Sequence, residues 1–225
     1  MAPPTLTPAQ SRILHDWKLS APVAKRHFIA IGRRGGASTL ATRSVVQDAL
    51  AFLNDPKDQD TNATFTLVAI NKDQSRLART VINALLWPYN PKPYHDGYII
   101  TTGPKKTAYI RTIPATVNHM RGYANRTVVL DGFAYYPNPH EIYLALSPTI
   151  QLPKGRMLIL TPPHHSDPDN YFNYLFHGHK NTTHTICRSV PTWEARTDDP
   201  NFSQNALYQV YGDSNIMSAH VTIPK

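Results

Sequence analysis

The stretch FIAIGRRGGASTLATRSVVQDALAFL, residues 28 to 53, decides the fold. An apolar run typical of a buried strand enters a turn containing Gly32, Gly35 and Gly36, and apolar residues at helical spacing follow it. Glycines permit tight turns and close backbone approach, and the first turn of a helix presents unpaired N–H groups to an anion. The stretch therefore predicts a phosphate-binding loop between a strand and a helix.

The same loop lacks one expected part. A lysine normally stands directly before the Ser38-Thr39 pair, but this position holds Ala37. A hydroxyl at the helix start is suited to ligate magnesium. Arg33 and Arg34 also lie in the loop, and a guanidinium binds phosphate although it copies a compact ammonium poorly. We therefore expect phosphate binding to outlast hydrolysis.

A second element of the same chemistry follows later in the chain. The apolar run TVVL predicts a strand that ends on Asp131. A carboxylate at a strand end is the group that a magnesium partner requires. We expect Asp131 at the end of a strand neighbouring the loop strand, within reach of Ser38. A plain turn and a surface aspartate are the structural alternative.

The rest of the chain alternates between apolar runs and amphipathic segments. The expected elements are helices at 8–17, 38–53 and 73–87, strands at 27–32, 64–70, 126–131 and 155–163, and a hairpin at 97–102 and 107–114. Because the strands are almost continuously hydrophobic, they predict an α/β fold with a mainly parallel sheet and helices on both faces. Ligands in such folds bind at the carboxyl ends of the strands.

Composition narrows the class of protein. A chain of 225 residues with 41% hydrophobic residues suits one globular domain, and no apolar run approaches the ~18 residues of a membrane span. The N-terminus lacks the design of a signal peptide, which argues against secretion. Cys187 is the single cysteine, so an internal disulfide is excluded and a reducing compartment is expected.

The formal charge of +8 is unevenly distributed. Residues 1–130 hold 17 Lys and Arg against seven Asp and Glu, whereas residues 131–225 hold six against eight. A concentrated positive half predicts a polyanion partner, since basic side chains that neutralise phosphates release counterions. A merely soluble basic surface is the alternative.

Several motifs, in order, give the sequence a family resemblance. From Gln10 onward it resembles the ATPase domain of the large terminase subunit, the motor that packages DNA into tailed-phage and herpesvirus-type capsids. The matching segments are TPAQSRIL with Gln10 as the adenine-contacting glutamine, GRRGGAST as the Walker A loop, TIPATVNHMRGYANRTVVLDGFAYYP as the segment through Walker B, GRMLILTPP as the coupling motif with Thr161 in the sensing position, and FSQNALYQVYGDSNIMSAHVTI as the junction to a nuclease domain.

The resemblance implies a P-loop NTPase-like fold of the additional-strand type. It implies one ATPase domain over 1–225, with 201–225 as a junction toward an absent nuclease domain, and ATP and Mg²⁺ as weakly bound cofactors. Ser38 and Asp131 are the expected magnesium ligands. The implied nucleotide-binding residues are Gln10, Gly32, Arg33, Arg34, Gly35, Gly36, Ser38 and Thr39.

Two departures from the family pattern affect the expected activity. The lysine position is Ala37, and the catalytic carboxylate expected after Asp131 is Gly132. Two hypotheses follow: a degenerate ATPase that binds nucleotide or DNA or acts as a structural module, and an active DNA-translocating motor rescued by unusual residues or a neighbouring subunit. Two unlinked losses favour the degenerate ATPase, and no nuclease activity is expected.

Few residues are available to replace the missing groups. Glu141 and Glu194 are the two glutamates, and solvated surface positions are favoured for both over a catalytic role. Lys105 or Lys106 is a candidate to bring a cation to the loop from the hairpin. Among these residues, Glu141 is the candidate substitute for the catalytic carboxylate.

The resemblance also implies partners and a location. Double-stranded DNA, contacted through its backbone, is the expected partner, with a portal, a small terminase, a separate nuclease subunit or further copies of the chain as others. No membrane partner is expected, and the host cytoplasm is the expected location of a viral protein. Tyr123 beside Arg121, and the Tyr135-Tyr136 pair, are candidates for stacking on nucleic acid, with core packing favoured for at least one of the pair.

A group of histidines suggests a competing site. The group comprises His164, His165, His177, His179 and His184, with Cys187 following. Zinc ligands usually come in two close pairs with defined spacing, and this pattern matches no such signature. Ordinary polar loop histidines are favoured, and no metal other than magnesium is expected.

Overall fold

The computed structural model describes residues 5–102, 106–120, 122–151, 153–164, 167, 169–180, 182–204 and 206. Its helices are α1 Pro8–Leu19, α2 Ala37–Asn54, α3 Lys72–Leu86, α4 Pro139–Leu146, α5 Tyr171–His179 and α6 Thr192–Ala195. Its strands are β1 Arg26–Ile31, β2 Asn62–Ala69, β3 Lys92–Tyr94, β4 Gly97–Thr102, β5 Lys106–Pro114, β6 Thr127–Asp131, β7 Arg156–Thr161 and β8 Thr185–Val190.

Within the described residues, eight strands form one sheet in the order β3-β4-β5-β2-β6-β7-β1-β8. The β3–β4 and β4–β5 pairs are antiparallel and all other pairs are parallel. Strand β7 lies between β1 and β6, so the strand that ends on Asp131 is not the immediate neighbour of β1 but the next one along. This inserted strand confirms the additional-strand type of sheet.

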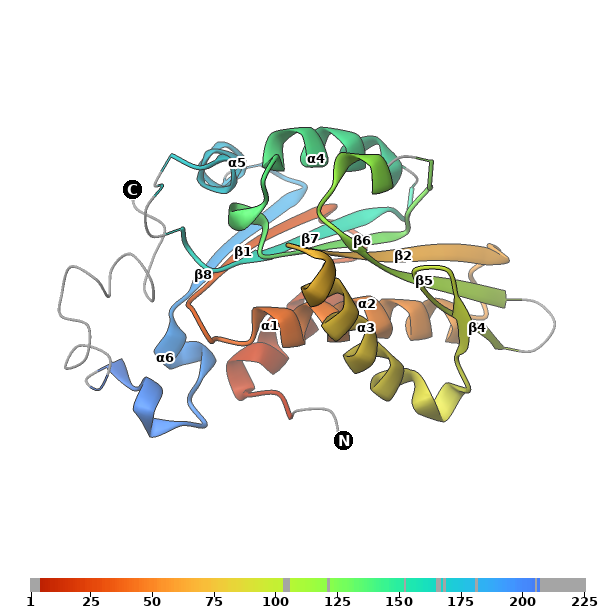
Figure 1. The fold of residues 1–225 in the computed structure, drawn as a ribbon, viewed down its shortest axis with the longest axis horizontal. Helices are drawn as coiled ribbons and strands as arrows, with labels where there is room; N and C mark the ends of the chain where they lie inside the picture. The colour runs from red at the N-terminus through yellow and green to blue at the C-terminus, as the bar shows by residue number, and fades with distance from the viewer. Residues whose placement is uncertain are drawn as a thin grey trace.

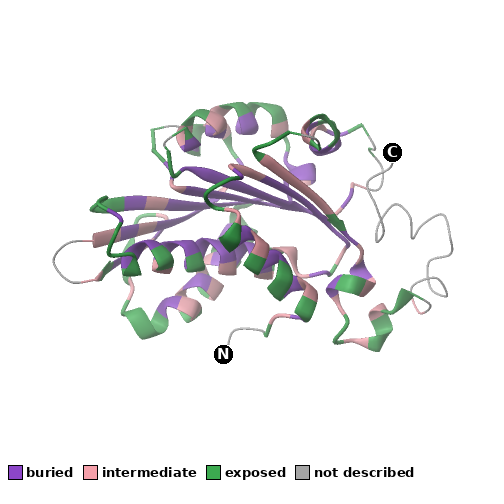
Figure 2. Cartoon of the chain, turned by 180° about the vertical axis from the view of Figure 1, so that it is seen from behind, coloured by how far each residue is buried: buried purple, intermediate pink, exposed green. Residues whose placement is uncertain are grey.

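Helices cover both faces of the sheet, as the hydrophobic strands predict. In Figure 1, α1, α2 and α3 lie on one face and α4 and α5 on the other. Each layer has its own buried cluster: Leu40, Val45 and Phe52 pack with β2 on one face, and Phe172 and Phe176 pack with Phe28 on the other. Figure 2 shows the strands buried between helices whose outer surfaces are exposed. The α/β fold class is confirmed.

Every helix and strand expected from the sequence is present, with ends shifted by a few residues. The expected hairpin is formed by β4 and β5, and its turn at residues 103–105 lies outside the described residues. The elements without a sequence prediction are β3, β8, α4, α5 and α6. Residues 201–225 fall almost wholly outside the described part, so their role as a junction and the single-domain assignment stay predictions.

Within the part of the chain that the structure describes, no helix combines the length and the apolar character needed to cross a bilayer.

Candidate functional site

The glycine-rich loop connects β1 to α2 in an unusual backbone conformation. Arg34 and Gly36 have positive φ angles of 60° and 87°, and the Gly35 N–H donates to the Gly32 carbonyl at 2.9 Å. A Cβ at Gly35 would lie 2.7 Å from the Gly32 carbonyl oxygen, so the turn requires a glycine there. Left-handed residues alternating along a loop form a concave nest of N–H groups that suits an anion.

Helix α2 begins directly after this loop. The Leu40 N–H donates to the Gly36 carbonyl at 2.9 Å, and helix geometry leaves the N–H groups of residues 37–39 without a partner inside the helix. The loop opens onto a cavity of ≈ 430 Å³, a size typical of small-molecule sites. The cavity is lined by Gly32, Arg33, Arg34, Gly35, Gly36, Ala37, Ser38, Thr39, Ile70, Gln74, Asp131, Gly132, Tyr135 and Pro162.

Asp131 and Ser38 meet in this cavity, as the sequence predicts. Asp131 is 7% exposed at the end of β6 and accepts a hydrogen bond from the Ser38 side chain. Burial raises the pKa of Asp131 to about 6, although the Ser38 hydrogen bond opposes the shift. A carboxylate and a hydroxyl next to an anion-binding loop are the oxygen donors that a Mg²⁺ site uses.

Gly132 occupies the position where a catalytic carboxylate is expected. Its φ of 77° lies in the left-handed region, and a Cβ there would approach Cδ1 of Ile70 at 2.5 Å. Any side chain at this position would therefore strain the backbone and displace Ile70. The backbone N–H of Gly132 donates to the Leu160 carbonyl at 2.8 Å, which fixes the turn.

The cations around the cavity come from the loop itself. Ala37 lines the cavity and packs against the apolar cluster beneath it, so the lysine position carries a methyl group. Arg33 lies across the loop, where its Nη2 donates to the Tyr135 hydroxyl at 3.4 Å. Arg34 is exposed. Lys106 instead donates to the Phe52 carbonyl at 3.2 Å near the C-terminal end of α2, and Lys105 lies outside the described residues.

The two glutamates lie away from this chemistry. Glu141 is exposed in the first turn of α4, and Glu194 is exposed on α6. Neither lines the cavity. The structure therefore gives no support to Glu141 as a substitute for the missing carboxylate.

Thr161 connects the end of β7 to the residues after Asp131. It is fully buried, and its hydroxyl accepts a hydrogen bond from the Ala134 N–H at 3.1 Å. Beside it, the Tyr135 hydroxyl donates to the Pro163 carbonyl at 2.8 Å. The expected coupling residue thus lies between the two strand ends that flank the cavity.

Gln10 does not line the cavity; its side chain holds the loop from behind. Its Nε2 donates to the Gly35 carbonyl at 2.8 Å, and its Oε1 accepts from the Thr7 N–H at 3.0 Å. Gln10 also completes a capping box with Thr7 at the start of α1. The Thr7-x-x-Gln10 spacing is the sequence signal for such a capping role.

Sequence reasoning missed four residues that touch the loop or the cavity. Ile70 and Gln74 line the cavity from the end of β2 and the first turn of α3. Thr192 and Arg196 donate hydrogen bonds to loop carbonyls from α6 and the residue after it. No local pattern marks these residues, because each is brought to the loop by the packing of distant elements.

The tyrosines and histidines have mainly structural contacts. Tyr136 is buried and donates to the Val68 carbonyl at 2.8 Å, which confirms core packing for one member of the pair. Tyr123 stacks on the Arg111 guanidinium, and Arg121 lies outside the described residues. Among the described residues, no three His, Cys, Asp or Glu side chains gather closely enough to hold a metal ion.

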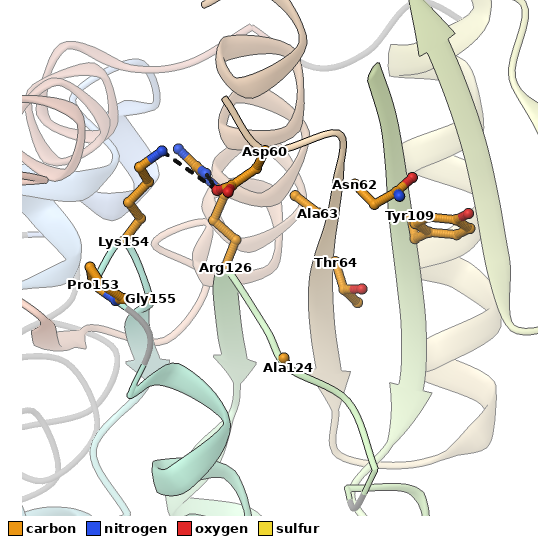
Figure 3. Close-up of a pocket in the computed structure, with 10 residues that line it drawn as sticks. All are labelled: Asp60, Asn62, Ala63, Thr64, Tyr109, Ala124, Arg126, Pro153, Lys154 and Gly155. Carbon is orange, nitrogen blue, oxygen red and sulfur yellow. Dashed lines mark hydrogen bonds and ion pairs between the residues drawn. The ribbon is translucent and has the colours of Figure 1, made fainter. Parts of the chain in front are cut away.

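A second cavity, of ≈ 320 Å³, lies at the opposite edge of the sheet (Figure 3). Its floor contains Ala63 and Ala124, and its rim carries Arg126 and Lys154, both ion-paired to Asp60. Because the charged groups at this rim are paired with one another, this cavity lacks the anion-binding character of the loop.

Comparisons with known proteins place the fold. The ATPase domain of the large terminase of Thermus phage P74-26 matches with a TM-score of 0.62 and 17% identity, over 88% of this chain and 87% of that one. The large terminase of another thermophilic bacteriophage, in complex with ATP-γ-S, matches 95% of this chain with a TM-score of 0.70 and 13% identity.

The large terminase of bacteriophage HK97 matches 99% of this chain, with a TM-score of 0.69 and 14% identity. The chain spans about half the length of these last two proteins, 52% and 51%. No family model and no curated protein matches the sequence. The chain therefore has the fold of the ATPase domain of phage large terminases.

Proposed function

We propose that the chain is a nucleotide-binding domain of a viral DNA-packaging assembly that holds Mg²⁺ and ATP weakly and hydrolyses ATP very slowly or not at all. One observation carries this proposal. A single cavity combines the anion-binding loop and the Ser38–Asp131 pair with a methyl group at Ala37 and a side-chain-free turn at Gly132. Parts for binding are present where parts for turnover are missing.

The residues present fit a magnesium–phosphate ligand. Ser38 and Asp131 would hold the ion, which supplies charge neutralisation on the phosphate oxygens when bound. The N–H groups at the start of α2 and in the loop would donate to those oxygens. Arg33 would add a positive charge in place of the lysine, although without its compact geometry.

The missing groups set the expected loss of rate. A preorganised cation on the transferred phosphate contributes roughly 10²–10³ in rate, and a general base contributes roughly 10²–10⁴. The backbone strain and the contact with Ile70 at position 132 oppose a simple return of the carboxylate. Turnover by this chain alone is therefore expected to be very slow.

Calorimetric titration of Mg²⁺–ATP tests the binding. The natural chain should bind near the millimolar range, and Ala37→Lys should tighten binding about 10- to 150-fold by restoring a charge-assisted hydrogen bond. Asp131→Ala is the control that should abolish the magnesium-dependent part of the affinity. If neither the natural chain nor Ala37→Lys binds at millimolar ATP, the proposal is wrong.

Hydrolysis by non-standard residues is a second candidate, and one observation favours it. Gln74 is exposed and lines the cavity from the first turn of α3, and a glutamine amide is able to orient an attacking water. A phosphate-release assay with DNA present separates the two candidates. Turnover near once per second that is lost in both Gln74→Ala and Asp131→Ala would establish the active motor.

The fold of the similar terminases supports the assignment to DNA packaging. By this analogy, the partners are double-stranded DNA contacted through its phosphates, other packaging proteins such as a portal, a small terminase or a nuclease subunit, and further copies of the chain. The host cytoplasm is the proposed location. Salt-dependent retention on DNA of mixed sequence tests the DNA contact, because backbone binding weakens steeply with ionic strength.

A further inference from the structure

Three consecutive carbonyl groups of the glycine-rich loop accept hydrogen bonds from distant side chains. Thr192 Oγ1 donates to the Arg33 carbonyl at 3.1 Å, and Arg196 Nη1 donates to the Arg34 carbonyl at 3.3 Å. Gln10 Nε2 donates to the Gly35 carbonyl at 2.8 Å. The donors come from α1 at one end of the fold's sequence and from α6 and its following residue at the other.

The segments that carry these donors are themselves fastened together. Thr7, the N-cap of α1, donates its hydroxyl to the Ala195 carbonyl at 2.8 Å. The Arg196 guanidinium is held from its far side by Asp198, at 3.0 Å, and by Asp199. The three donors therefore form one braced unit, which we call the carbonyl clamp and define as Gln10, Thr192 and Arg196.

The geometry of the peptide bond turns this clamp into a device for orienting donors. In a trans peptide the C=O and the following N–H point in opposite directions. A carbonyl that is held by the clamp therefore turns the next residue's N–H away from the clamp. This applies to the N–H groups of Arg34, Gly35 and Gly36, of which Gly35 closes the turn onto Gly32.

The clamp also stabilises an uncommon backbone conformation. Arg34 is a non-glycine residue with φ of 60°, a conformation that costs free energy unless the surroundings impose it. The hydrogen bond from Arg196 reaches the carbonyl of this same residue. The clamp thus holds the part of the loop that would otherwise relax.

We propose that Thr192 and Arg196, together with Gln10, are positioning residues that shape the loop for a polyphosphate chain, whatever base the nucleotide carries. The inference rests on the proposed function, since it concerns the same site. It assigns Gln10 to the loop backbone and not to the adenine ring, because both ends of its amide are engaged by Gly35 and Thr7. It also makes the phosphate affinity depend on the placement of α6.

The test is calorimetric titration of inorganic tripolyphosphate, ATP and GTP into the full chain and its variants. Thr192→Val keeps the shape of the side chain and removes only the donor, and Arg196→Ala removes the second donor. Each variant should weaken all three ligands by the same factor, about threefold to tenfold, as expected for one lost hydrogen bond. Arg196→Lys should recover part of the loss, because an ammonium is also able to donate to the Arg34 carbonyl.

Arg188→Ala is the matched control, because it removes an ion pair to Asp16 on α1 that does not touch the loop. It should leave all three affinities within about twofold. A second readout needs no ligand: the amide exchange of Gly35 should accelerate about threefold to tenfold in Thr192→Val and Arg196→Ala and stay unchanged in the control.

The outcomes separate the two proposals. Natural affinities and natural Gly35 exchange in both clamp variants would overturn the inference and leave the proposed function standing. Weakened ATP binding with unchanged tripolyphosphate binding would also overturn it, because the effect would then act on the base. A natural chain that binds none of the three ligands would overturn the proposed function and this inference with it.

Discussion

Asp131 is an acidic residue whose position in the fold favours its protonated form. Burial raises its pKa from 3.8 to about 6. Below pH 4 the carboxyl is protonated in the folded and unfolded chains, and above pH 6 it is ionised in both, so the folded chain then bears the full cost of burying the charge. This residue's contribution to stability is therefore lost as the pH rises from about 4 to above 6.

The corresponding prediction is that Asp131→Asn stabilises the ligand-free protein at pH 8 by about 2 to 3 kcal/mol and has little effect at pH 4. Urea denaturation at the two pH values, with a chelator present, measures the difference. Equal effects at both pH values would contradict the assigned cause. The same variant should weaken Mg²⁺-dependent nucleotide binding, so stability and binding oppose each other at this residue.

Gly132 gives a second prediction at this scale. Gly132→Glu should destabilise the protein by about 1 to 3 kcal/mol, because it combines a left-handed backbone with displacement of Ile70. Adding Ile70→Ala should remove the steric part, so the double variant should be more stable than the sum of the two single changes predicts. Urea denaturation of the three variants measures the coupling, and strict additivity would exclude the contact as its source.

The sequence could predict the meeting of Ser38 and Asp131 because each residue stands at the end of an apolar run whose place in the sheet follows from the motif order. It could not predict the contacts of Gln10. The same glutamine fits an adenine-contacting motif and a capping box, and only the packing of α1 against the loop decides where its amide points.

At the level of elements, α2 is attached to the sheet by a buried ion pair. Arg156 at the start of β7 donates from Nε to Asp48 of α2 at 3.1 Å and stacks on Trp17 of α1. The two side chains are 11% and 8% exposed. Removing one partner from such a pair leaves the other charge without compensation.

We therefore expect Arg156→Met to destabilise the fold by about 3 to 5 kcal/mol, and the double variant with Asp48→Asn to lose much less than the sum of the two single changes. Chemical denaturation of the complete cycle measures the interaction. Arg76→Ala is the control, since its ion pair with Asp73 is largely exposed and should change stability by less than about 0.5 kcal/mol. A coupling free energy near zero would contradict this view of the pair.

The elements that escaped sequence prediction share a physical reason. Strand β8 is an edge strand that is only partly buried, so its sequence TICRSV lacks the continuous apolar run of β1 and β7. Helices α4 and α5 are eight and nine residues long, too short for helical spacing to stand out. Strong patterns therefore predicted the core strands, and the edges that complete the site emerged only from packing.

At the level of the whole molecule, the two edges of the sheet respond to pH in opposite ways. Opposite the loop, Asp58 is buried beside Arg126 and Lys154. Burial alone would raise its pKa, but hydrogen bonds from Lys154, the backbone and Arg126 outweigh that effect and lower it to about 2. The contribution of Asp58 is fully present above about pH 4 and is lost as the pH falls toward 2.

Asp58→Asn should therefore lower the free energy of unfolding at pH 7 by about 1 to 2 kcal/mol, a range reduced for solvent screening of its exposed partners. The difference from the natural chain should shrink as the pH falls from 4 to 3. Urea denaturation across this range provides the measurement. A difference that stays constant with pH would show that Asp58 acts through packing and not through its charge.

The pairing of β1 has a consequence for how the protein is made. Within the described residues, β1 pairs only with β7 and β8, whose residues leave the ribosome long after those of β1. At typical rates of synthesis, the interval is on the order of ten seconds. During that time the apolar segment HFIAI has no strand beside it and is exposed to chaperones or to other nascent chains. The glycine-rich loop is thus translated early and becomes competent late.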